Sequence, residues 1–152
     1  MKIKELLISI AISLGVGLLS ALITMNNQNI YDFINVPSFA PPGIVFPIVW
    51  TILYILLGIS SYIIYKSNDY DRGNALIIYG IQLFLNFFWS IIFFNFKNFI
   101  FAFIWIILLL ISIIVMIYKF YKINALAGLL NIPYLIWVIF ASILNFSIII
   151  LN

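Results

Sequence analysis

Amide and aromatic side chains recur at helical spacing in the segment around residue 86. Gln82, Asn86 and the pair Trp89 and Ser90 follow one another every three to four residues, so they share one face of a helix. An unpaired amide in an apolar environment costs free energy, and both amides should therefore face the protein interior. There they could hydrogen-bond between helices or line a pocket. Spacing alone leaves both interpretations open.

Two further segments carry stripes with the same period. One stripe consists of Phe46, Trp50 and Tyr54, and the other of Trp137, Ala141 and Leu144 with Asn145 beside it. Indole and phenol rings make favourable offset-stacked and edge-to-face contacts with other aromatic groups. The three stripes together therefore predict either helix packing or a pocket lined by indoles and one amide donor.

The residue types that are missing restrict the chemistry. The chain has no Cys and no His, which removes thiolate chemistry and the commonest general base and metal ligand. No Asp, Glu, Lys or Arg lies within a long apolar run. We therefore expect no catalytic acid–base pair, no metal site and no resident cofactor. If the protein were an enzyme, only Trp50 and Trp137 could serve, as redox-active indoles.

The composition indicates which solvent surrounds these stripes. Of the 152 residues, 66% are hydrophobic and 7% are charged, and the mean hydropathy is +1.28. A soluble domain has roughly 25% charged residues. This chain has too few polar side chains to cover a globule in water, so its solvent must be lipid. The small, dispersed net charge of +3 does not suggest a nucleic-acid partner.

Apolar runs of membrane-spanning length occur five times. About 20 residues of helix cross the hydrocarbon core of a bilayer. The sequence predicts an all-α polytopic membrane protein, a single domain over residues 1–152 built as a bundle of five transmembrane helices. The predicted helices are Leu6–Met25, Ile44–Tyr65, Ala75–Phe94, Phe99–Tyr118 and Ala125–Leu151. The first run is longer than the core of a signal peptide and is predicted to be a retained helix.

Basic residues predict the orientation of this bundle. Six of the seven lie on the side of the N-terminus, the second loop and the fourth loop, and Lys97 alone lies on the other side. The excess of Lys and Arg in cytoplasmic loops places the N-terminus in the cytoplasm and the C-terminus outside. The long first loop then faces away from the cytoplasm.

The first predicted helix and the loop after it have distinct patterns. Small residues recur every four positions at Ser9, Ser13, Gly17 and Ala21, a pattern that lets another helix approach closely, within the chain or in a dimer. The loop contains three prolines in residues 37–43, each of which fixes φ and lacks a backbone donor. It could be a rigid lid over a site or a stiff connector.

Three motifs stand in order on three of the predicted spans. The first is Pro37-Ser38-x-x-Pro41-Pro42-Gly43, continuing as Val45-Phe46-x-x-x-Trp50-Thr51-x-Leu53-Tyr54. The second is Gln82-Leu83-x-Leu85-Asn86-x-x-Trp89-Ser90-x-x-Phe93-Phe94, and the third is Pro133-Tyr134-Leu135-x-Trp137-x-x-Phe140-Ala141-x-x-Leu144-Asn145. From about residue 31 to 150, the chain resembles the translocator protein family, also called tryptophan-rich sensory proteins or peripheral-type benzodiazepine receptors.

This resemblance implies a fold, a ligand class and a site. The family is a five-helix bundle, commonly a homodimer, that binds porphyrins and other hydrophobic aromatic molecules in a pocket near the first loop. Carried over by motif, the ligand-binding residues are Tyr31, Pro41, Trp50, Tyr54, Asn86, Trp89, Ser90, Trp137, Ala141 and Leu144. The expected partners are the lipid bilayer, a second copy of the chain and a tetrapyrrole such as protoporphyrin IX. The expected location is a bacterial cytoplasmic membrane.

Some positions depart from the family pattern. Phe39 stands where the family usually has Trp, and Phe146-Ser147-Ile148 supplies neither the Tyr nor the basic residue of the animal sterol motif. Sterol binding is therefore not expected. The resemblance implies a binding protein that senses, transports or disposes of porphyrins. The alternatives are an enzyme that degrades porphyrins by light- or oxygen-dependent chemistry and a membrane scaffold without a ligand.

Overall fold

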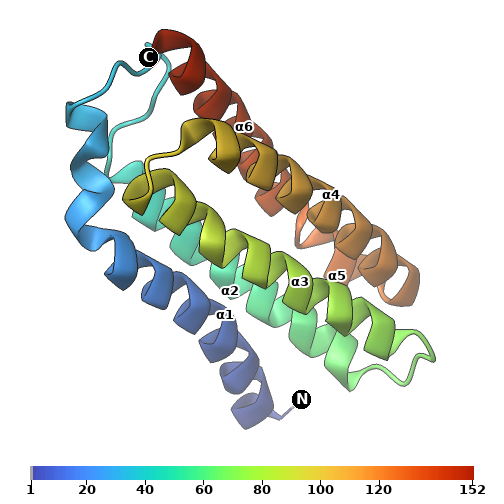
Figure 1. The fold of residues 1–152 in the computed structure, drawn as a ribbon. Coiled ribbons are helices and arrows are strands. Elements are labelled where there is room, and N and C mark those ends of the chain that lie inside the picture. Colours follow the sequence, from blue (N-terminus) through green and yellow to red (C-terminus); the bar gives the residue numbers. More distant parts are fainter. Residues whose placement is uncertain (1) are drawn as a thin grey trace.

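The computed structural model describes residues 2–152, and the chain forms helices without strands over this range (Figure 1). Five helical segments are long and apolar enough to cross a membrane, which confirms the predicted fold class. The elements are α1 (Ile3–Thr24), η1 (Met25–Asp32), α2 (Val45–Lys66), α3 (Arg72–Ser90), η2 (Ile91–Asn95), α4 (Phe99–Ile123), α5 (Ala125–Leu129) and α6 (Ile132–Leu151). The first and third spans each consist of an α-helix and its continuation, η1 or η2.

Polar residues at helix ends account for most differences from the predicted bounds. The first span does not end near Asn26 as predicted. Its polar end continues as the 3₁₀ turns of η1 as far as Asp32. Likewise α4 runs beyond the predicted end at Tyr118. It stops at Asn124, whose extended backbone ends the helix and whose side chain caps the next one.

The last apolar run is interrupted, although the sequence predicts one continuous helix. A turn separates α5 from α6 around Asn131, a fully buried residue whose Nδ2 donates to Ser60 Oγ at 3.0 Å. Pro133 lies in the first turn of α6, where its missing backbone donor costs nothing. The interruption therefore holds a polar contact with α2 inside the bundle.

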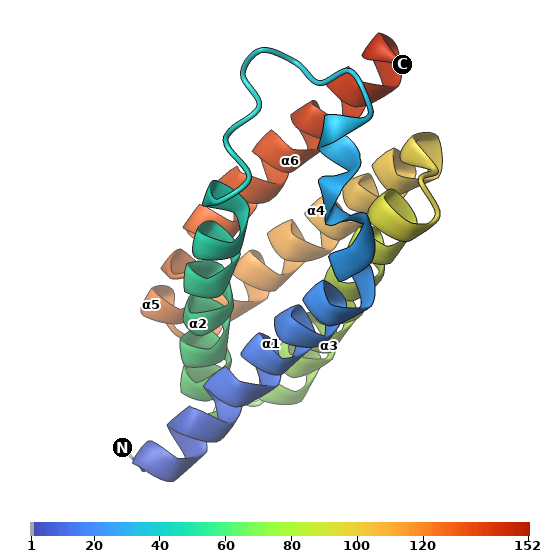
Figure 2. The ribbon, with the colours of Figure 1, turned by 90° about the vertical axis from the view of Figure 1, so that its left-hand side faces the viewer.

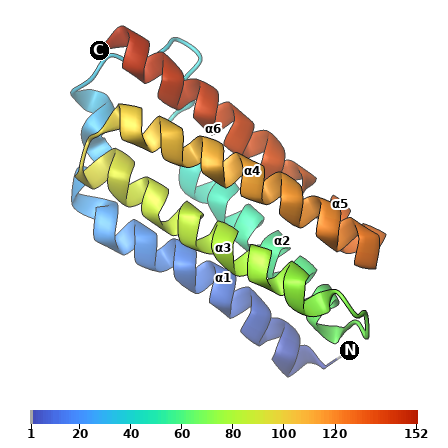
Figure 3. The same ribbon diagram turned by 45° about the vertical axis from the view of Figure 1, so that its right-hand side comes forward.

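The helices pack side by side around a buried apolar core. Figure 3 shows α1, α3, α4 and α6 side by side, and α1 also packs closely on α2. The two termini lie at opposite ends of the bundle (Figure 1). Figure 2 shows residues 33–44 crossing the end of the bundle that carries the C-terminus. Asn35 in this segment donates its backbone N–H to Asn152 Oδ1 at 3.0 Å, beside the end of α6.

The outer faces of the helices are apolar. Large side chains such as Phe84 on α3, Ile104 on α4 and Ile136 on α6 are more than half exposed. Water would penalise so much exposed apolar surface, whereas hydrocarbon does not. Together with the five membrane-length helices, these faces make the protein integral to a membrane.

Two of the small residues of α1, Ser13 and Gly17, pack against α2 within the chain. Ser13 is fully buried and its hydroxyl donates to the Tyr54 carbonyl at 2.6 Å, while a Cβ on Gly17 would lie 2.2 Å from the Tyr54 ring. The backbones of the two helices also approach closely at Gly58, where a Cβ would lie 2.4 Å from the Cα of Ile10. The predicted close helix contact is thus made by α1 with α2, which answers a question that the sequence left open.

Candidate functional site

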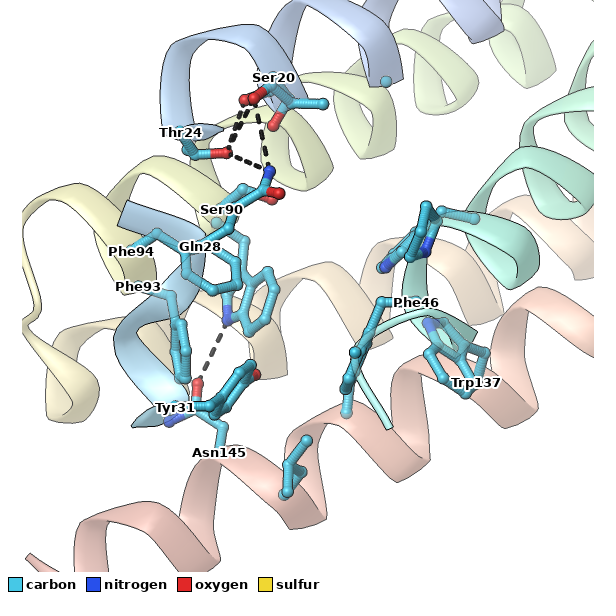
Figure 4. Close-up of a pocket in the computed structure, with 18 of the residues that line it drawn as sticks. Ser20, Thr24, Gln28, Tyr31, Phe46, Ser90, Phe93, Phe94, Trp137 and Asn145 are labelled. Atoms are coloured by element: carbon cyan, nitrogen blue, oxygen red, sulfur yellow. Dashed lines mark hydrogen bonds between the residues drawn. The ribbon is translucent and has the colours of Figure 1, made fainter. Parts of the chain in front are cut away.

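A pocket lies between α1 with η1, α2, the junction of α3 with η2, and α6 (Figure 4). It contains about 1040 Å³ of space not filled by protein atoms, including the space at its open mouth. The lining residues are Gly17, Ser20, Ala21, Thr24, Gln28, Tyr31, Gly43, Phe46, Pro47, Trp50, Tyr54, Trp89, Ser90, Phe93, Phe94, Trp137, Ala141, Leu144 and Asn145.

Most of the residues carried over by motif meet in this pocket. Those that line it are Tyr31, Trp50, Tyr54, Trp89, Ser90, Trp137, Ala141 and Leu144. Two others do not line it. Pro41 lies half-buried in the segment between η1 and α2, and Asn86 lies in the helical core. The stripes found by periodicity on α2 and α6 therefore converge on one cavity with Trp89 and Ser90, the last residues of the α3 stripe.

Aromatic rings form the walls of the pocket. Trp50 stacks on Tyr54 with ring centroids 5.6 Å apart and meets Trp137 edge to face at 6.5 Å. Phe46 lies between Trp137, at 5.8 Å, and Tyr31, at 5.9 Å. Trp50 and Trp137 are only half-buried, so part of each indole remains available to a ligand.

The wall formed by the third span depends on the wide turn η2. Its backbone makes a bond from the Phe96 N–H to the Ile91 carbonyl, one residue wider than in an α-helix. Such wide turns are frequent at functional sites. Just before it, Trp89 donates its indole N–H to Asn145 Oδ1 at 3.2 Å, and this bond fixes α3 against α6. The turn and the bond together hold an indole edge at the pocket.

Asn86 holds helices together. Its Oδ1 accepts from the Tyr54 hydroxyl at 2.7 Å, and its Nδ2 donates to the Tyr134 hydroxyl at 2.8 Å. The Tyr134 hydroxyl in turn donates to Gln82 Oε1 at 2.7 Å. Both ends of the Asn86 amide are thus occupied by protein groups from α2 and α6. The geometry favours the interhelical interpretation of this residue over the ligand-binding one.

We expect Asn86→Leu to lower stability by about 1–2 kcal/mol, because it leaves the buried Tyr54 hydroxyl without an acceptor. Thermal melting of the detergent-solubilised protein, with and without protoporphyrin IX, checks this. The shift produced by the porphyrin should match that of the wild type. Asn74→Leu, an exposed position near the start of α3, is the matched control. An unchanged melting temperature with loss of the porphyrin-induced shift would instead put Asn86 in contact with the ligand.

Three polar residues of the first span that line the pocket are not among the site residues predicted from the sequence. Ser20, Thr24 and Gln28 line the pocket, and Figure 4 shows them gathered on one side, apart from Phe46 and Trp137. They recur every four residues, the same signal that revealed the stripes on the other helices. Gln28 falls in the segment predicted to be a loop, which concealed the pattern.

The pocket suits uncharged aromatic groups. No Asp, Glu, Lys or Arg is among the residues that line it. The indole N–H of Trp137 is buried without a hydrogen-bond partner in residues 2–152. The walls can therefore stack on a planar ligand and can exchange hydrogen bonds with neutral polar groups. A carboxylate buried there would find no positive partner, so the propionates of a porphyrin would have to stay at the open mouth of the pocket.

Comparison with known proteins identifies the family. The model of the TspO/MBR family matches residues 9–151. The "Tryptophan-rich protein TspO" of Archaeoglobus fulgidus is 38% identical over 100% of this chain and 99% of its own length. The "Tryptophan-rich sensory protein" of Cereibacter sphaeroides is 34% identical over 80% of this chain and 76% of its own length. The human "Translocator protein" is 29% identical over 92% of this chain and 85% of its own length. The chain belongs to the TspO/MBR family of membrane proteins.

Proposed function

We propose that this protein binds porphyrins such as protoporphyrin IX, and similar hydrophobic aromatic molecules, and acts in their sensing, transport or disposal. The observation that carries the proposal is the convergence of Trp50, Trp89 and Trp137 from three helices on one open pocket within the bundle. The names of its relatives, a sensory protein and a translocator protein, fit a sensory or transport role.

The pocket chemistry supports a flat, largely apolar ligand. Each aromatic contact with a macrocycle would add about 0.5–1.5 kcal/mol beyond the burial of area. The unpartnered Trp137 N–H is a donor that a ligand acceptor could satisfy once ring positions adjust. With neither His nor Cys in the chain, a metal-free porphyrin suits the site better than a haem held by a strong axial ligand.

Absorbance titration of the purified protein with protoporphyrin IX tests the proposal. A shifted, saturable Soret band is the expected result. Bleaching of the bound porphyrin with time would favour the degrading enzyme, with Trp50 and Trp137 as its redox-active indoles. An unchanged spectrum at all concentrations would contradict the proposal and favour a scaffold without a ligand.

The orientation remains a prediction from charge. We expect the N-terminus in the cytoplasm, and reporter fusions after Lys66 and after Asn152 should then report opposite sides, the first of them cytoplasmic. Equal reporter signals at the two positions would contradict this orientation.

The homodimer also remains a prediction. Because Ser13 and Gly17 pack against α2 within one chain, a dimer would have to form through other faces.

A further inference from the structure

On the polar side of the pocket, the hydroxyl groups of Ser20 and Thr24 already donate their hydrogens to backbone carbonyls, so towards a ligand they can act as acceptors. The Thr24 hydroxyl donates to the Ser20 carbonyl at 2.9 Å, and the Ser20 hydroxyl makes a longer bond of 3.4 Å to the Phe87 carbonyl. A hydroxyl has one hydrogen and two lone pairs. Both hydroxyls therefore direct their single hydrogen at backbone. The Ser20 oxygen keeps its lone pairs free, and the Thr24 oxygen keeps one beside the bond that it accepts from Gln28.

The amide of Gln28 is oriented by its surroundings. Its Nε2 donates to the Ala21 carbonyl at 3.4 Å and to Thr24 Oγ1 at 3.1 Å. A carbonyl can only accept, so the nitrogen and not the oxygen must occupy this position. Gln28 Oε1 is left without a partner in residues 2–152, beside the two hydroxyls.

From this arrangement we infer that Ser20, Thr24 and Gln28 determine ligand specificity by selecting aromatic ligands that carry O–H or N–H donors along one edge. The inference rests on the proposed function and refines its ligand class. The aromatic body of the ligand lies against Trp50 and Trp137, and its donor edge faces the acceptors of α1 and η1 across the pocket (Figure 4).

The selection has a physical cause. A donor that enters the pocket loses its hydrogen bonds to water, and an unoccupied acceptor restores them. A ligand with only ether or carbonyl oxygens at that edge would set its lone pairs against those of Gln28 Oε1 and the two hydroxyls. The acceptors are neutral, so the preference is for neutral donors and requires no opposite charge.

A matched pair of porphyrins tests the inference. Haematoporphyrin IX carries hydroxyethyl groups where protoporphyrin IX carries vinyls, and its di-O-methyl ether replaces the two hydroxyl donors by methoxy groups that can only accept. Dissociation constants from Soret titration should favour haematoporphyrin IX over the ether by about tenfold in the wild type, the effect of one satisfied hydrogen bond. In Gln28→Met the ratio should fall towards one.

Two more variants make the test decisive. Ser20→Ala independently removes another of the three polar groups, and it should also lower the ratio of the two dissociation constants. Thr51→Val removes a hydroxyl on the exposed face of α2 and should leave the ratio at its wild-type value. Equal affinities for the two porphyrins in the wild type would overturn the inference while leaving porphyrin binding intact. An unchanged ratio in both Gln28→Met and Ser20→Ala would overturn it in the same way. If neither porphyrin bound saturably, the proposed function would fail, and the inference with it.

Discussion

Gly58→Leu is expected to destabilise the protein by about 3 kcal/mol, at the upper end of the cost of overpacking. Even the first carbon of a side chain would lie 2.4 Å from the Cα and 2.9 Å from the backbone nitrogen of Ile10. Backbone cannot turn away as a flexible side chain can, so α1 must move off α2. Thermal melting of the detergent-solubilised protein measures the effect.

Gly80→Leu is the matched control for this prediction. Gly80 lies on the exposed face of α3, and a Cβ there would meet nothing within 4 Å. Its leucine variant should melt at or above the wild-type temperature, since leucine favours a helix over glycine. Similar melting of the two variants would contradict the close contact of α1 with α2.

Trp50→Ala should weaken binding of protoporphyrin IX by about 1–3 kcal/mol, or about 5- to 140-fold in Kd, through the loss of a stacking indole. Trp50 contacts Tyr54, Tyr134 and Trp137, so its ring lies at the centre of the aromatic wall. The Soret titration measures Kd.

Trp105→Ala controls for the loss of an indole outside the pocket. Trp105 on α4 donates its N–H to the Leu85 carbonyl at 2.7 Å and does not line the cavity. This variant should keep the wild-type Kd even if its melting temperature falls. Equal weakening in both variants would show that binding depends on general stability and not on Trp50.

Hydropathy predicted the number and approximate position of the spans because lipid imposes one length on every helix that crosses it. It could not predict how polar segments at the ends fold. Asn26 looks like the start of a loop, yet the chain continues as η1, and this continuation brings Gln28 and Tyr31 to the pocket. Hydropathy also could not predict the turn at Asn131, because this turn depends on a hydrogen bond to Ser60, which is distant in the sequence.

Helical period located the aromatic stripes, because residues four apart share a face whatever that face contacts. Period alone cannot identify the partner of a polar group on the face. Asn86 shares its stripe with Trp89, but Tyr54 and Tyr134 saturate its amide. Tyr134 is part of a sequence motif, but the sequence assigned it no role. Its buried hydroxyl lies between the amides of Asn86 and Gln82, an arrangement that only the three-dimensional structure reveals.

The pocket between α1, α2, α3 and α6 is proposed to hold a planar aromatic ligand. The most direct test is a structure of the protein determined in complex with protoporphyrin IX. We predict density for the macrocycle within this pocket, in contact with Trp50 and Trp137. A macrocycle bound only on the lipid-facing surface, with the pocket unchanged and empty, would contradict the claim.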